Sequence, residues 1–203
     1  MRQYEFTYWG APVVGQVLNV FSPLTLADKF YSYNANVGVN NWVIENQNNV
    51  MMPGKGYAIR APQGYTTTPQ VFSGEFIGVP NNGNISANVA GFNPALLNYN
   101  LLTNPYPSAI NVITLLDNTN LGTLYFWTHN SAITNNVFTS SDYAIRTRTT
   151  GIAAVTGGTA PGLNIAAGQA FFASAGTTTT INFTNAMRVA GNNSQFYRNA
   201  QNV

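Results

Sequence analysis

The stretch Met52-Pro53-Gly54-Lys55-Gly56-Tyr57-Ala58-Ile59-Arg60-Ala61 decides the fold class. A Pro-Gly pair stands directly before a short apolar run, which indicates a tight turn that leads into a buried β-strand. A second, weaker copy of this pattern follows at Ala166-Ala167-Gly168-Gln169-Ala170-Phe171-Phe172-Ala173-Ser174-Ala175. Two copies of one turn-and-strand pattern indicate an all-β protein with internal repetition.

Three further pairs of short strings occur in the same order along the chain. They are Trp9-Gly10-Ala11-Pro12-Val13 with Thr103-Asn104-Pro105-Tyr106-Pro107, Phe30-Tyr31-Ser32-Tyr33-Asn34 with Tyr125-Phe126-Trp127-Thr128-His129-Asn130, and Val71-Phe72-Ser73-Gly74-Glu75-Phe76 with Thr180-Ile181-Asn182-Phe183-Thr184. Together they predict a duplicated β unit, with halves at residues 1–93 and 94–203 that share one core. The alternative is that four short β-type strings line up by chance.

The expected fold is therefore an all-β sandwich, jelly-roll-like, with one or two short helical turns. Ser22 and Ser108 are the predicted starts of these turns, and Pro23 would take the first helical position. Residues 66–74 and 75–79 have strand-like composition and are predicted to be strands separated by glycine.

Two turns predict hairpins. Asn82-Gly83 supplies the positive φ angles of a tight hairpin turn, and residues 85–89 follow as the returning strand. Gly176 separates residues 168–174 from residues 177–183, which predicts a second hairpin.

The composition limits the chemistry that is available. Charged residues make up only 7% of the chain and the net charge is +2, which disfavours binding to nucleic acid. There is no cysteine, so disulfide and thiolate chemistry are excluded. No apolar run reaches the length of about 18 residues that a membrane helix needs, and no apolar signal segment follows Met1, so we expect no membrane insertion. A surface rich in amide and hydroxyl groups favours a location outside the cell.

Catalysis is the least favoured reading of the polar residues. His129 is the single histidine, and a catalytic triad would need it near Asp117 or Asp142 and a serine such as Ser141. The simpler interpretation is a histidine at a strand end that bonds to a neighbouring loop. Glu45 and Glu75 could approach across a sheet as a glycosidase pair, but solvated or singly paired carboxylates are expected.

The metal-ligating residues are sparse as well. One histidine and no cysteine exclude a His-rich or Cys-rich zinc site. No clustered aspartates predict a calcium site, although backbone and Asn carbonyl groups could still hold this ion. We therefore expect no catalytic residue, no cofactor and no dedicated metal site.

Aromatic residues are the best candidates for a binding surface. Tyr31, Tyr33, Trp42, Tyr125 and Trp127 could present ring faces to a glycan. Alternation along a strand places Tyr125 and Trp127 on one face and Phe126 on the other. Burial of these rings in a β core is the alternative.

A resemblance to a known module rests on seven motifs in a fixed order. They are Tyr-Trp-Gly-Ala-Pro-Val, Pro-Gly-Lys-Gly-Tyr, Gly-Val-Pro-Asn-Asn-Gly, Asn-Pro-Tyr-Pro-Ser-Ala-Ile, Tyr-Phe-Trp-Thr-His-Asn, Ala-Ala-Gly-Gln-Ala-Phe-Phe and Met-Arg-Val-Ala-Gly-Asn-Asn-Ser-Gln-Phe. The chain resembles a β-rich module near the C-terminus of large adhesin-like surface proteins of Bacteroidota that are exported by type IX secretion. The resemblance implies a place on the cell surface and no particular activity. No sorting domain follows Val203 in this sequence, which leaves the mode of anchoring open.

The expected function is that of a non-catalytic structural or adhesive module of an extracellular bacterial surface protein. One alternative is a subunit that assembles into a fibre or surface layer through its sheet edges. The other is a carbohydrate-binding domain that uses exposed aromatic rings. The expected partners are copies of the chain itself, neighbouring surface modules, or glycans.

Overall fold

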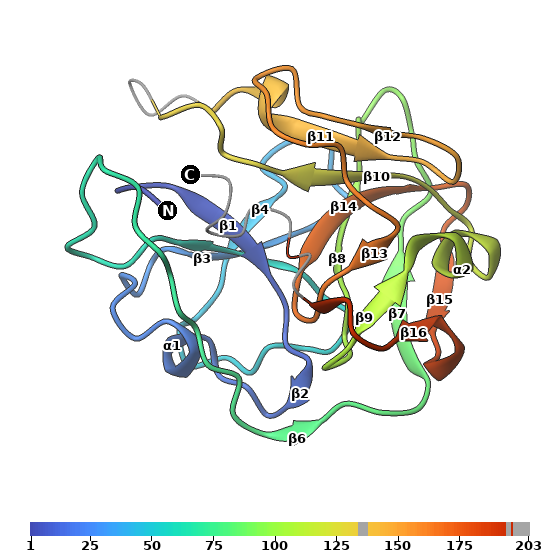
Figure 1. The fold of residues 1–203 in the computed structure, drawn as a ribbon, viewed down its shortest axis with the longest axis horizontal. Coiled ribbons are helices and arrows are strands. Elements are labelled where there is room, and N and C mark those ends of the chain that lie inside the picture. The colour runs from blue at the N-terminus through green and yellow to red at the C-terminus, as the bar shows by residue number, and fades with distance from the viewer. Residues whose placement is uncertain (134–137, 194–195, 197–203) are drawn as a thin grey trace.

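A computed structural model describes residues 1–133, 138–193 and 196. Within these ranges the regular secondary structure consists mostly of antiparallel strands, with two short α-helices and two single turns of 3₁₀-helix (Figure 1). The predicted all-β class is confirmed. The sandwich arrangement and the division into halves at residue 93 stay predictions. No helix among the described residues has the length and apolar content that a membrane crossing requires.

The first large sheet has four strands in the order β1-β5-β3-β4. These strands are β1 (Phe6–Trp9), β5 (Tyr57–Arg60), β3 (Phe30–Tyr33) and β4 (Trp42–Ile44). All neighbours are antiparallel. β4 therefore forms one edge of this sheet.

The second large sheet has five strands in the order β12-β11-β10-β14-β8. These strands are β8 (Asn100–Thr103), β14 (Ala170–Ala175), β10 (Leu121–Trp127), β11 (Tyr143–Arg146) and β12 (Gly151–Ile152). Read from β8, the order β8-β14-β10-β11 repeats the chain-order pattern of β1-β5-β3-β4. The second sheet differs because β12 is added beyond β11.

The registers of the two sheets allow residues to be matched. Trp9 pairs with Tyr57 in the first sheet, and Leu102 pairs with Phe171 in the second. Tyr57 and Phe171 thus hold equivalent positions, and both are buried.

The opening stretch and its second copy both form a turn that leads into a buried strand, as predicted. Gly54 has a φ of 81° and Gly168 a φ of 68°, in the left-handed region that favours glycine. The Gly54 carbonyl accepts a hydrogen bond from Thr103 N–H at 3.1 Å, and the Gly168 carbonyl accepts one from Gly10 N–H at 2.9 Å. Each turn therefore binds the chain at the end of the first strand of the other sheet.

The structure also contains smaller sheets of two or three short strands. β2 (Val13–Val14) pairs with β6 (Val79–Pro80). β9 (Ala109–Asn111) lies between β13 (Asn164–Ile165) and β16 (Arg188–Val189).

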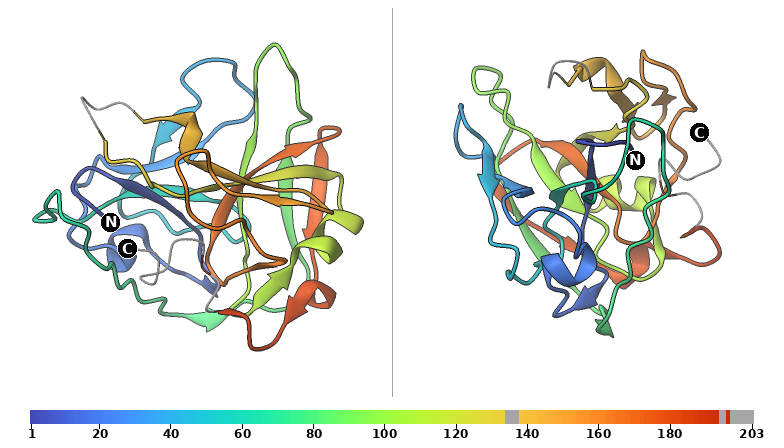
Figure 2. Two further views of the ribbon diagram at one scale, coloured as in Figure 1. Left: turned by 45° about the horizontal axis from the view of Figure 1, so that its top comes forward. Right: turned by 90° about the vertical axis from the view of Figure 1, so that its left-hand side faces the viewer.

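The two predicted hairpins are wrong, although the chain bends at both Gly83 and Gly176. β7 (Ile85–Val89) pairs along its whole length with β15 (Thr179–Phe183), and the two strands lie side by side in the left view of Figure 2. β14, which precedes the Gly176 turn, pairs with β8 and β10 instead of β15. Pairing between distant segments replaces pairing across the turns.

The positions of the helices also differ from the prediction. α1 (Leu18–Phe21) ends where the Ser22 helix was expected to begin, because Leu18 and Phe21 are the residues that face the core. α2 (Val112–Asp117) begins after β9 instead of at Ser108, and the Asn111 side chain caps it by accepting from Thr114 N–H at 3.0 Å. The 3₁₀ turns are Ser140–Asp142 and Asn185–Met187.

Residues 66–78 form no strand, so the predicted strands at 66–74 and 75–79 are wrong. This segment is held by its side chains instead. Phe72 and Phe76 pack against Phe21, with ring centroids 5.6 Å and 4.8 Å apart. The match between residues 71–76 and residues 180–184 therefore does not extend to secondary structure.

The core consists of three clusters of buried side chains. One surrounds α2, β10 and β14, and a second lies beneath α1 and β5. The third joins the two large sheets and includes Tyr8 and Ala58 from the first with Leu101 and Phe172 from the second.

Candidate functional site

An apolar groove of about 460 Å³ lies between the first sheet and the strands β10 and β11. Among its ten described lining residues, Ala58, Thr139 and Ser140 are small and none is charged. The other seven are aromatic: Phe6, Tyr8, Tyr31, Trp42, Trp127, Phe138 and Tyr143. We call this feature the aromatic groove.

The floor of the aromatic groove is a row of side chains that crosses the first sheet. Tyr8 of β1 and Tyr31 of β3 both pair with Ala58 of β5, so the three side chains point to the same face. The row continues to Ile44 of β4, which pairs with Tyr31. Strand pairing therefore gathers residues that are far apart in the sequence into one surface.

Ala58 explains why the groove is open. The equivalent position in the second sheet is Phe172, since both residues pair with the first strand of their sheet. The Phe172 ring fills its surroundings and packs edge-on against Tyr8 at 5.5 Å and Tyr33 at 4.8 Å between centroids. The methyl group of Ala58 occupies much less volume, which leaves room between the rings above it.

Two tyrosine hydroxyl groups inside the groove satisfy each other. The hydroxyl oxygens of Tyr8 and Tyr143 lie 2.7 Å apart, and the Trp127 ring stacks over Tyr8 at 6.2 Å. Burial, followed by the proximity of Tyr143, raises the pKa of Tyr8 well above its usual value. Burial also raises the pKa of Tyr143. Both groups stay neutral at physiological pH, so the described lining residues of the groove carry no charge.

The predicted glycan-contact residues belong to one aromatic network. Trp42 and Trp127 line the groove. Tyr33 packs edge-on against Trp42 at 5.1 Å, and Tyr125 packs against Tyr99 at 5.1 Å. Tyr33 and Tyr125 thus lie beside the groove and are not among its described lining residues.

The predicted alternation along β10 is confirmed. Phe126 is buried in the cluster around α2, whereas Tyr125 and Trp127 point to the other face. Sequence reasoning identified Tyr31, Trp42 and Trp127 but missed Phe6, Tyr8, Phe138 and Tyr143 as lining residues. The alternation of Phe6 and Tyr8 was a usable signal, because it places two rings on one face of β1.

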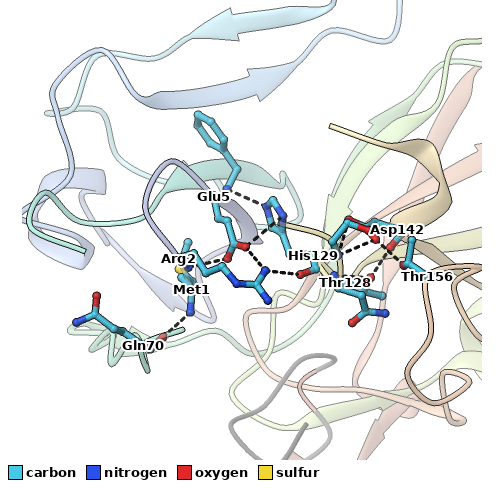
Figure 3. Close-up of polar contacts among 11 residues, drawn as sticks. Met1, Arg2, Glu5, Gln70, Thr128, His129, Asp142 and Thr156 are labelled. Carbon is cyan, nitrogen blue, oxygen red and sulfur yellow. Dashed lines mark hydrogen bonds and ion pairs between the residues drawn. The ribbon is translucent and has the colours of Figure 1, made fainter. Parts of the chain in front are cut away.

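His129 lies in a buried polar cluster (Figure 3), and its ring centroid is 4.8 Å from that of the lining residue Trp127. Its Nε2 accepts a hydrogen bond from Phe6 N–H at 3.0 Å, and its Nδ1 is 3.9 Å from Oε1 of Glu5. Arg2 donates to Glu5 at 2.8 Å and to the His129 carbonyl at 3.4 Å. The cluster therefore binds the chain before β1 to the end of β10.

Asp142, one of the two predicted acidic partners of His129, faces other groups. The buried Asp142 carboxylate accepts hydrogen bonds from Ser131 N–H at 3.2 Å and from the Thr156 hydroxyl (Figure 3). Asp117, the other predicted partner, forms an exposed ion pair with Arg148 at 2.6 Å. The acidic neighbour of His129 is Glu5 instead. The interpretation of His129 as a residue bonded to neighbouring chain fits this geometry.

The remaining polar candidates lie apart from the groove. Glu45 forms an ion pair with Lys55 at 2.7 Å, and Glu75 is exposed. Burial opposes ionisation of Glu45, but hydrogen bonds from Lys55, Ser32 and Asn49 hold its pKa below the usual value. Within the described ranges, no group of three or more His, Cys, Asp or Glu residues is placed to hold a metal ion.

Comparison with known proteins gives a family but no activity. No curated protein and no solved structure matches the chain. The family model described as a domain of unknown function (DUF8693) matches residues 1–203, so the chain belongs to this family.

Proposed function

We propose that this chain is a non-catalytic adhesive module of an extracellular bacterial surface protein, and that it binds through the aromatic groove. The observation that carries the proposal is the groove itself, with seven aromatic residues and no charged residue among the ten described ones. Concave sites lined by aromatic rings with few polar groups are typical of binding sites in proteins. The sparse charge of the chain, at 7%, supports contact with uncharged partners.

The chemistry of the groove favours an apolar segment of another polypeptide as the ligand. The hydroxyl groups of Tyr8 and Tyr143 are hydrogen-bonded to each other. The other described lining residues that carry a hydroxyl group are Tyr31, Thr139 and Ser140. A ligand with many hydroxyl groups would lose water there without enough replacement bonds, at a cost of about 1–3 kcal/mol for each unsatisfied group. Aliphatic or aromatic side chains avoid this cost.

A neutral sugar is the second candidate, and Trp42 is the observation that favours it. Its ring is 40% exposed at the rim of the groove. An exposed indole can stack on the apolar face of a sugar ring while the sugar hydroxyl groups stay in water.

Binding to arrays tests the proposal. Fluorescently labelled chain is applied to an array of uncharged and charged extended peptides and to an array of neutral and acidic glycans. We expect binding to uncharged peptides that carry large apolar side chains. Trp42→Ala should weaken this binding by about tenfold or more, because tryptophan is enriched among the few interface residues whose truncation costs about 2 kcal/mol or more.

Ala58→Phe is the sharper variant, since it places in the groove the ring that Phe172 supplies in the other sheet. We expect it to abolish binding without unfolding the chain, which circular dichroism checks. Leu24→Ala removes an exposed apolar side chain outside the groove and serves as the matched control. Binding that survives both Trp42→Ala and Ala58→Phe would overturn the proposal. Binding to neutral glycans alone would select the second candidate.

A further inference from the structure

We propose that two copies of this chain join through the outer edge of β4, as an antiparallel strand pair that makes one continuous sheet. This contact differs from ligand binding in the aromatic groove, although Trp42 takes part in both. It concerns the backbone of Trp42, Val43 and Ile44, which form the last strand of the first sheet.

The hydrogen bonds of β4 define which of its backbone groups face outward. Asn34 N–H donates to the Asn41 carbonyl and Glu45 N–H donates to the Phe30 carbonyl, each at 2.8 Å. In antiparallel pairs every second residue bonds to its neighbour strand, so Val43 bonds to β3. The N–H and C=O groups of Trp42 and Ile44 therefore point away from the sheet. No strand among the described residues pairs with them.

This edge lacks the features that normally prevent sheets from joining. Exposed edge strands are usually protected by charged residues, proline or a bulge. β4 has none of these, and its side chains are exposed by 40% for Trp42, 44% for Val43 and 61% for Ile44. The nearby Glu45 is neutralised by Lys55. An uncharged edge favours an uncharged partner strand, which another β4 supplies.

In the second sheet, the position equivalent to the outer edge of β4 is occupied by a strand. Ile145 of β11 is equivalent to Ile44, because Ile145 pairs with Tyr125 as Ile44 pairs with Tyr31. On its outer side Ile145 pairs antiparallel with Ile152 of β12. The first sheet has no counterpart of β12 among the described residues, so an antiparallel strand from outside the chain would complete it.

A second copy fits this place because β4 is complementary to itself about a two-fold axis. With Val43 opposite Val43 of the second copy, Trp42 stands opposite Ile44 of the second copy, and the outward groups of these residues form four hydrogen bonds. Trp42 and Ile44 lie on one face, so apolar side chains meet across the joint. Three residues bury far less than the roughly 1,200 Å² of a stable interface. The contact is therefore weak in solution and grows stronger where copies are held close together.

Cysteine crosslinking tests the register directly, because the natural chain has no cysteine. Val43→Cys places two thiols at the centre of the pair, with Cβ atoms about 4.5–5.5 Å apart, near enough for a disulfide after a small adjustment. Oxidised glutathione accepts the two electrons and two protons. We expect disulfide dimers to form about tenfold faster or more than with Val155→Cys, a site outside the strands that is 88% exposed. Equal rates for the two variants would overturn the proposal.

Sedimentation velocity of the unmodified chain over a range of concentrations gives a second measurement. We expect a weak shift towards dimer at high concentration. Ile44→Lys, which sets like charges near each other across the joint, should remove the shift while circular dichroism stays unchanged. A chain that stays monomeric throughout, or a shift that Ile44→Lys leaves intact, would contradict the pairing.

Discussion

The two large sheets place equivalent strands in the same order but differ at two positions. The first sheet, β1-β5-β3-β4, has alanine at position 58 and ends at β4. The second sheet has Phe172 at the position equivalent to Ala58, and β12 covers the edge of β11. The first sheet therefore has an open groove and an open edge where the second sheet has a ring and a strand.

This difference shows how one strand arrangement can serve two purposes. In the second sheet the larger side chain and the added strand complete the core and satisfy the backbone. In the first sheet the groove above Ala58 is open, and no strand among the described residues pairs with the outer edge of β4. The proposals for the groove and for β4 both follow from this asymmetry.

The largest effect on stability is expected from truncating the buried aromatic residue that each sheet has at the equivalent position, Tyr57 or Phe171. Phe171→Ala and Tyr57→Ala should each lower the free energy of unfolding by about 3–5 kcal/mol, since each leaves a cavity in a packed cluster. Urea unfolding followed by tryptophan fluorescence measures this. If the sheets form one cooperative unit, both variants keep a single transition. Two separate transitions in either variant would show that the sheets unfold independently.

A smaller loss of stability is expected when the polar residue that precedes the first strand of each sheet is replaced by alanine. Glu5 precedes β1 and meets Arg2 and His129, whereas Asn98 precedes β8 and donates to the Ala35 carbonyl at 2.9 Å. Glu5→Ala should cost about 1.5–3 kcal/mol because it removes hydrogen bonds to a buried charged group. Asn98→Ala should cost about 1–2 kcal/mol, as expected for neutral hydrogen bonds. Thermal unfolding of both variants measures the difference, and a larger loss for Asn98→Ala would contradict the assigned roles.

The smallest effect on stability is expected from alkaline pH, and it probes the junction of the two sheets. Tyr8 and Tyr143 have raised pKa values through burial, so the folded chain keeps phenolic protons that the unfolded chain releases above about pH 10. The free energy of unfolding should therefore fall as the pH rises from about 9 to about 11. The double variant Tyr8→Phe with Tyr143→Phe should lose less stability over this range. An equal loss in both proteins would mean that other groups cause the alkaline change.

Local sequence patterns predicted the fold class and part of the groove. The Pro53-Gly54 turn, the strand after it and the alternation of Tyr125, Phe126 and Trp127 are local features, and the structure has each of them. The pairing of β7 with β15 depends on segments far apart in the chain, so no local turn could predict it. Residues 66–78 have the composition of strands because they contain apolar residues. In the structure two of these apolar residues, Phe72 and Phe76, pack against the core from a segment without strands.

The groove was predicted only in part for the same reason. Trp42 and Trp127 were identified as exposed aromatic candidates, but the floor formed by Tyr8, Ala58 and Tyr31 depends on the register of three strands. The importance of Ala58 becomes visible only when it is matched with Phe172, which requires the strand order of both sheets.

Amide hydrogen exchange at Ile44 and Ile145, followed by NMR, tests the difference between the two sheet edges most directly. These residues have the same side chain and equivalent positions, and only Ile145 has a partner strand on its outer side among the described residues. In dilute solution the Ile145 amide should exchange at least about tenfold more slowly than the Ile44 amide, because a paired amide must open before it exchanges. At high concentration the Ile44 amide should slow as copies pair through β4. Equal protection of the two amides in dilute solution, or an Ile44 amide that does not respond to concentration, would contradict an open and self-pairing β4 edge.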